Sequence, residues 1–206
     1  MDGVRSCAAR TVLGLRSSLL MACSVQLKLK ILLTAILLTT IPLIGSATVP
    51  CTFENKGLGG GPSFKFNFSK EECRLVETRN GSVVTLTVQY PEMKLIGARV
   101  VDDSVVVLRM SHIDSERYDQ NGIIGTREPD RRLGTIDIYD VGSDEMYRFR
   151  GKDGEVVFVR NMGNTYLAKR LVAGDVFVFY QYSKNHQDLE YLDATITGFL
   201  SQKLVR

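Results

Sequence analysis

The chain contains only two histidines, His112 and His186, and they lie far apart in the sequence. His112 stands in Ser111-His112-Ile113-Asp114-Ser115, which combines hydroxyl, imidazole and carboxylate groups as a hydrolase would. On a strand, however, alternate side chains point to opposite faces, so the hydroxyls diverge from the imidazole. We therefore expect His112 at a polar strand end and His186 in an exposed polar turn. The sequence predicts no catalytic residue and no zinc site.

Carboxylates are the next residues that could do chemistry, because oxygen ligands bind calcium. The candidate ligands lack the spacing of an EF-hand, so we expect charged turns and assign neither a metal site nor a cofactor. A glycine-rich run at 57–61 lacks the Lys-Ser/Thr that completes a phosphate loop, which indicates a connector. The candidate calcium ligands are Asp137, Asp140, Asp144, Glu145 and Asp153.

Two further clusters could bind a partner. Arg127, Arg131 and Arg132 form a basic patch that could hold a sulfated glycan or an acidic protein, but Glu128 and Asp130 lie among them, which favours a solvated loop. The run at 176–180, VFVFY, is apolar on both faces of a strand. This favours a covered central strand over an exposed aromatic strip.

Residues 1–47 have the order of a secretory signal segment: Lys28 and Lys30, the apolar run 31–44, then Gly45-Ser46-Ala47. We expect cleavage after Ala47, with an uncleaved type II membrane anchor as the alternative. Met21 is a possible true start of translation. The remaining chain has 21 basic and 22 acidic residues, so nothing indicates a nucleic-acid partner.

Cleavage would leave two cysteines, Cys51 and Cys73, in an oxidising compartment. We predict that they form a disulfide closing a loop of about 22 residues, two unrelated buried thiols being the alternative. Asn67-Phe68-Ser69 and Asn80-Gly81-Ser82 are acceptor triplets for N-glycosylation. The sequence thus predicts a secreted, extracellular glycoprotein.

These residues must be positioned by short β-branched and aromatic runs separated by turn residues, the pattern of an antiparallel all-β domain. We expect a β-sandwich of roughly 8–10 strands with little helix at 63–206, after a Gly/Pro-rich loop at 48–62. Ser69 and Glu72 have capping-box spacing and predict one short helical turn within 69–76. Residues 120–132 read as a polar excursion. The expected strands are 82–89, 95–101, 104–113, 134–140, 146–150, 155–159, 165–172, 175–182 and 192–200.

The stretch 134–151, GTIDIYDVGSDEMYRFRG, resembles the middle of a CUB domain. Residues 192–199 are similar to the closing strand of that family, and Cys51 and Cys73 are placed like its first disulfide pair. Arg150 stands where the family has a cysteine. Gly134 and Asp137 stand where its calcium-binding members have aspartate and glutamate, so calcium binding does not carry over. The resemblance implies a jelly-roll sandwich that binds proteins or glycans outside the cell.

The leading hypothesis is a secreted, non-enzymatic recognition module for an extracellular protein or glycan. One alternative is a carrier of a small hydrophobic ligand, which needs strands closed around a cavity. The other is a hydrolase that uses carboxylates alone, which needs two acidic side chains facing each other across a groove.

Overall fold

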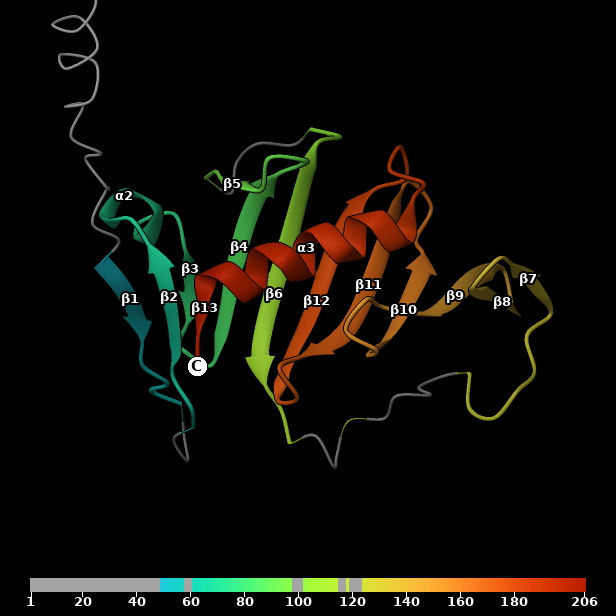
Figure 1. Ribbon diagram of the computed structural model, residues 1–206, viewed down its shortest axis with the longest axis horizontal. Coiled ribbons are helices and arrows are strands. Elements are labelled where there is room, and N and C mark those ends of the chain that lie inside the picture. Colours follow the sequence, from blue (N-terminus) through green and yellow to red (C-terminus); the bar gives the residue numbers. More distant parts are fainter. Residues whose placement is uncertain (1–48, 58–60, 98–101, 115–117, 119–123) are drawn as a thin grey trace, which may run out of the picture. The chain divides into compact units, whose positions relative to one another are not determined.

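The computed structural model describes residues 49–57, 61–97, 102–114, 118 and 124–206 (Figure 1). The chain divides after residue 45, and every described residue belongs to the second unit. The predicted signal segment therefore lies outside the described residues. Strands hold 49% of the described residues and two helices hold 13%, which confirms an antiparallel, mostly β fold. In the part of the chain that is described, no helix is long and apolar enough to cross a membrane.

One large antiparallel sheet forms the first layer of the fold. Its strands follow the order β3-β4-β6-β12-β11-β10-β9-β8-β7, with β5 paired to β4, and the sheet does not close into a barrel. The strands are β3 (Glu77–Arg79), β4 (Val83–Gln89), β5 (Lys94–Leu95), β6 (Val105–His112), β7 (Arg131–Leu133), β8 (Ile136–Val141), β9 (Asp144–Arg150), β10 (Val156–Asn161), β11 (Thr165–Val172) and β12 (Val176–Ser183).

The second layer consists of a small sheet and a helix. The small sheet contains β1 (Val49–Phe53), β2 (Phe64–Phe68) and β13 (Leu204–Val205) in the order β1-β2-β13. Helix α3 (Leu189–Lys203) runs across the large sheet in Figure 1, and the short α2 (Lys70–Cys73) follows β2. A mostly β two-layer fold was predicted, but part of the second layer is helical.

The core lies between the two layers, because strand alternation turns every second side chain inward. Phe64, Phe66 and Phe68 of β2 are buried while the residues between them are exposed. They share one apolar cluster with inward residues of β4, β6 and β12, and with Leu192 and Ile196 of α3. The inner face of the large sheet is therefore covered by side chains of β2 and α3.

Helix α3 occupies residues that the sequence predicted to be a strand, 192–200, so that prediction was wrong. The buried residues Leu189, Leu192, Asp193, Ile196 and Leu200 recur at helical spacing. Two features concealed this stripe: a carboxylate occupies one of its buried positions, and the run Thr195-Ile196-Thr197 favours strands. The two strands predicted within 134–151, in contrast, are present as the antiparallel pair β8 and β9.

The N-terminal region also differs from expectation. Residues 49–53, predicted to be loop, form β1 and pair with β2 from Val49↔Phe68 to Phe53↔Phe64. The alternating phenylalanines of β2 carried the signal for this hairpin. The capping box was predicted correctly: Ser69 Oγ accepts from the Glu72 N–H, and the Glu72 carboxylate accepts from the Ser69 N–H.

The β3–β4 hairpin needs glycine at position 81. Gly81 has φ +69°, and a Cβ there would lie 1.8 Å from the Glu54 carbonyl oxygen. We expect Gly81→Ala to lower the free energy of unfolding by roughly 1–3 kcal/mol, measured by urea denaturation. Gly163→Ala is the matched control, because Gly163 has φ +76° but open space around it. Equal losses in both variants would contradict a role for the Glu54 contact.

Candidate binding groove

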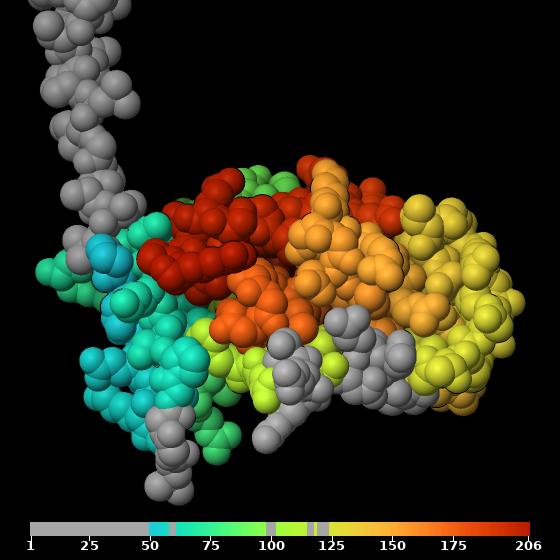
Figure 2. Space-filling view, turned by 60° about the horizontal axis from the view of Figure 1, so that its bottom comes forward, coloured from blue at the N-terminus to red at the C-terminus, as the bar shows by residue number. Residues whose placement is uncertain are grey.

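A groove of about 520 Å³ lies where the β11–β12 turn meets the small sheet. Its walls come from the chain before and within β2, from the end of β6, from the turn at 173–175 and from β13. In Figure 2 the blue-green atoms of the chain around β2, the red atoms of the C-terminal region and the orange atoms near the middle of the view lie next to one another. The lining residues are Pro62, Ser63, Phe64, Lys65, His112, Ala173, Asp175, Val176, Leu204, Val205 and Arg206.

A second hollow of about 550 Å³ continues from the first along α3. Both hollows are lined by Ala173, Leu204 and Arg206, so they adjoin, and together they are here named the turn-end groove. Thr197, Gly198 and Ser201 of α3 line the second part, together with Lys152 and Asp153 of the β9–β10 turn. The groove is therefore long and open, with apolar and hydroxyl groups on its floor.

The turn-end groove carries uncompensated positive charge. Lys65, Lys152 and Arg206 are exposed, and none has an ion-pair partner among the described residues. The two carboxylates in the lining, in contrast, are already paired: Asp175 with His112, and Asp153 with Arg170. An anionic ligand would thus meet three available cations, while both side-chain carboxylates of the lining are already paired.

His112 is held at the inner wall of this groove. Its Nδ1 lies 3.0 Å from Asp175 Oδ2, and its ring stacks on Phe64 with centroids 4.4 Å apart. Because an ionised carboxylate only accepts hydrogen bonds, Nδ1 carries the proton. No sequence motif indicated Asp175 as the partner, because it lies 63 positions from His112 and reaches it only through the antiparallel pairing of β6 with β12.

A histidine beside a carboxylate in a groove is an arrangement that hydrolases use. Here the free ring nitrogen, His112 Nε2, is buried and has no hydrogen-bond partner in the described structure. A general base must reach the proton that it removes. Because Nε2 is buried, it does not face the open part of the groove in this structure.

Beneath the second part of the groove, a buried guanidinium joins α3 to the large sheet. Arg170 of β11 is 0% exposed, and its Nη1 lies 2.5 Å from Asp193 Oδ2 of α3. Tyr180 Oη donates to Asp193 Oδ1 at 2.7 Å, and Arg170 also pairs with Asp153. Gly151 leaves the space, because a Cβ there would lie 2.5 Å from Arg170 Nη1.

Burial and charge compete within this cluster. Burial raises the pKa of the Asp193 carboxyl above its usual value, outweighing the opposite effects of Arg170 and Tyr180. Burial also raises the pKa of Tyr180, and the charge of Asp193 adds to the effect. For Arg170, burial favours the neutral form, but the two carboxylates outweigh it and raise its pKa. The guanidinium therefore stays charged in the core.

The carboxylates considered above as calcium ligands are instead paired with arginines, for example Asp144 with Arg160 and Asp153 with Arg170. No group of three or more potential metal ligands occurs within the described residues. The basic patch is likewise paired: Arg127 with Asp130, Arg131 with Asp140 and Glu145, and Arg132 with Asp137. This end of the sheet is thus a network of paired charges.

Among the described residues, two carboxylates that could serve the carboxylate-hydrolase alternative, Asp137 and Glu190, line a hollow of about 590 Å³. Arg132 and Arg148 each lie 2.9 Å from an Asp137 oxygen. Burial pushes the pKa of Asp137 upward, but these two arginines outweigh it and hold the pKa below its usual range. Asp137 is therefore a poor proton donor. The general acid of a glycosidase needs a raised pKa, so that it can donate a proton.

The aromatic run at 176–180 lies in β12, between β6 and β11, as predicted for a central strand. Its outward residues Phe177 and Phe179 are half-buried, and the Tyr118 ring lies 5.6 Å from that of Phe177. A hollow of only about 150 Å³ lies beside Phe179. His186, predicted to be exposed, is half-buried, with Nε2 2.8 Å from the Asp103 carbonyl oxygen.

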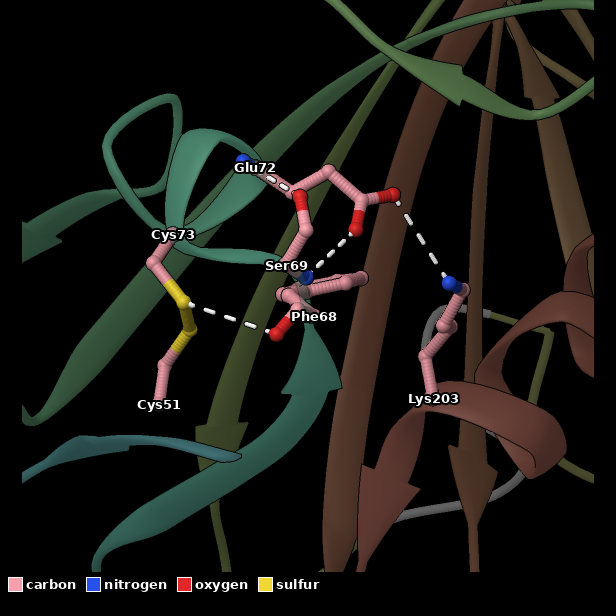
Figure 3. The surroundings of a disulfide bond; sticks show 6 residues. All are labelled: Cys51, Phe68, Ser69, Glu72, Cys73 and Lys203. Atoms are coloured by element: carbon pink, nitrogen blue, oxygen red, sulfur yellow. Dashed lines mark hydrogen bonds and ion pairs between the residues drawn. A yellow bond between two sulfur atoms is a disulfide. The ribbon is translucent and has the colours of Figure 1, made fainter. Parts of the chain in front are cut away.

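Cys51 and Cys73 form the predicted disulfide, with Cα atoms 6.0 Å apart (Figure 3). The same figure shows Glu72, from the capping box, reaching Lys203 of α3, and these two groups lie 3.7 Å apart. Lys203 directly precedes β13, so the disulfide region is tied to one wall of the turn-end groove. Asn67 is exposed on β2 and Asn80 in the β3–β4 turn, and their glycosylation stays a prediction.

The positive charge of the turn-end groove comes from Lys65, Lys152 and Arg206, and no sequence motif indicated these residues. Their only signal was charge, and exposed lysines and arginines occur throughout the chain. No protein-family model, no curated protein and no solved structure matches this chain.

Proposed function

We propose that this protein is a secreted, non-enzymatic recognition module and that it binds an anionic extracellular protein or glycan in the turn-end groove. One observation carries the proposal: three exposed cations without partners line a groove whose own side-chain carboxylates are already paired. The predicted signal segment and the Cys51–Cys73 disulfide support an extracellular setting.

The two alternatives have less support. A carrier of a hydrophobic ligand would enclose it, but the sheets do not close into a barrel and the face beneath α3 is packed with side chains. A carboxylate hydrolase would need a proton donor, and Asp137 is held ionised by two arginines. The open, positively charged groove fits reversible binding better than either.

The test is binding of two anionic probes, heparin and poly-L-glutamate, by calorimetry at low and physiological salt. We expect binding that weakens as salt rises, and roughly tenfold or more weaker binding by the triple variant K65E/K152E/R206E. The control R79E/K94E/R109E has the same change in net charge on exposed residues that do not line the groove. Failure to bind either probe, or equal losses in both variants, would overturn the proposal.

A further inference from the structure

The groove also has the backbone geometry to select among anionic partners. Resting on the function proposed above, we infer that its ligand is an extended acidic peptide segment of another protein, which pairs with β13 as a fourth strand of the small sheet. Main-chain hydrogen bonds would supply part of the affinity and the three cations would select acidic side chains.

The small sheet ends at β13, whose outer edge has no neighbouring strand among the described residues. Within the described structure β13 is the outermost strand of the small sheet and pairs only with β2, through Leu204↔Phe66 and Val205↔Lys65. The Leu204 N–H bonds to the Leu200 carbonyl of α3 and not to β2. Because backbone groups alternate in direction along a strand, the Leu204 carbonyl and the Arg206 N–H both face away from β2.

The outer edge of β13 lies in the turn-end groove. Leu204 and Arg206 line both halves of the turn-end groove, so this edge lies where the two halves adjoin. A peptide extended along β13 would therefore pass through both halves. Lys65 lies in the first half, Lys152 in the second, and Arg206 in both.

The walls of the groove offer both cations and apolar side chains to a peptide. Acidic side chains would meet the cations, while intervening side chains would lie on the partly exposed Ala173, Leu204 and Val205. A peptide offers N–H and C=O groups at the spacing of a strand, so it can use the free groups of β13. A sulfated glycan could match the charges but has no such backbone.

The experiment compares two capped hexapeptides with three glutamates each, one alternating Glu with Thr and the other alternating Glu with Pro, on the full chain. Proline has no N–H, but the glutamates that alternate with it could still donate in the other strand register. In the Glu-Pro peptide this second register is excluded by also methylating the glutamate nitrogens, so that no residue can donate to β13 while the charge is unchanged. We expect the Glu-Thr peptide to bind roughly tenfold tighter. We also expect it to slow hydrogen exchange of the Arg206 amide, measured by NMR.

The outcomes separate this inference from the proposed function. Heparin binding in the groove without Glu-Thr binding, or equal affinity for both peptides, would overturn strand addition and leave an anion-binding module. Binding of no anionic probe would overturn both. Glu-Thr binding that the K65E/K152E/R206E variant loses and the R79E/K94E/R109E variant keeps, with protection at Arg206, would establish it.

Discussion

Replacing Asp193 by alanine is expected to lower the free energy of unfolding by about 3–5 kcal/mol. Asp193 is 1% exposed and provides the only fully buried carboxylate that the Arg170 guanidinium contacts in the described structure. Without it, a buried cation keeps only Asp153, which is 43% exposed. Tyr180 would lose the acceptor of its hydroxyl as well. Urea denaturation followed by circular dichroism gives the comparison.

A second variant separates the loss of charge pairing from the loss of packing. Arg170→Met with Asp193→Leu removes both charges and keeps apolar volume, so we expect it to recover most of the lost stability. Asp153→Asn should cost much less than Asp193→Ala, because solvent screens the exposed partner. A loss under about 1 kcal/mol for Asp193→Ala would show that the ion pair does not hold α3 on the sheet.

Removing the disulfide is expected to have the next largest effect. For a loop of this length, the double variant Cys51→Ala with Cys73→Ala should unfold with a free energy about 3 kcal/mol lower. The physical reason is that the cross-link limits the conformations of the unfolded chain. The measurement is urea denaturation of the oxidised protein and of the variant.

Two controls make this result specific. The native protein treated with reductant should fall to the stability of the double variant, and the variant itself should not respond to reductant. If reductant changed the two proteins equally, or neither, the stabilisation would not come from the Cys51–Cys73 bond. Because α2 reaches Lys203 through Glu72, we expect loss of the bond to weaken binding in the turn-end groove as well.

The sequence by itself predicted the elements whose signals are local. Alternation of apolar residues identified β4, β6 and β8 to β12, since one buried face imposes a period of two. Ser69 and Glu72 predicted the start of α2, because a capping box needs only neighbouring residues. The disulfide was predictable because only two cysteines, Cys51 and Cys73, remain after the predicted signal cleavage, and two cysteines can pair in one way.

Tertiary structure decided the rest, because it depends on partners distant in the chain. Asp193 can occupy the buried stripe of α3 only because Arg170, 23 residues earlier, neutralises it, and this pairing concealed the helix from its own pattern. His112 meets Asp175 through strand register, and the cations of the turn-end groove come from β2, the β9–β10 turn and the residue after β13. A strand's composition tells which face is buried, but only folding determines what lies opposite it.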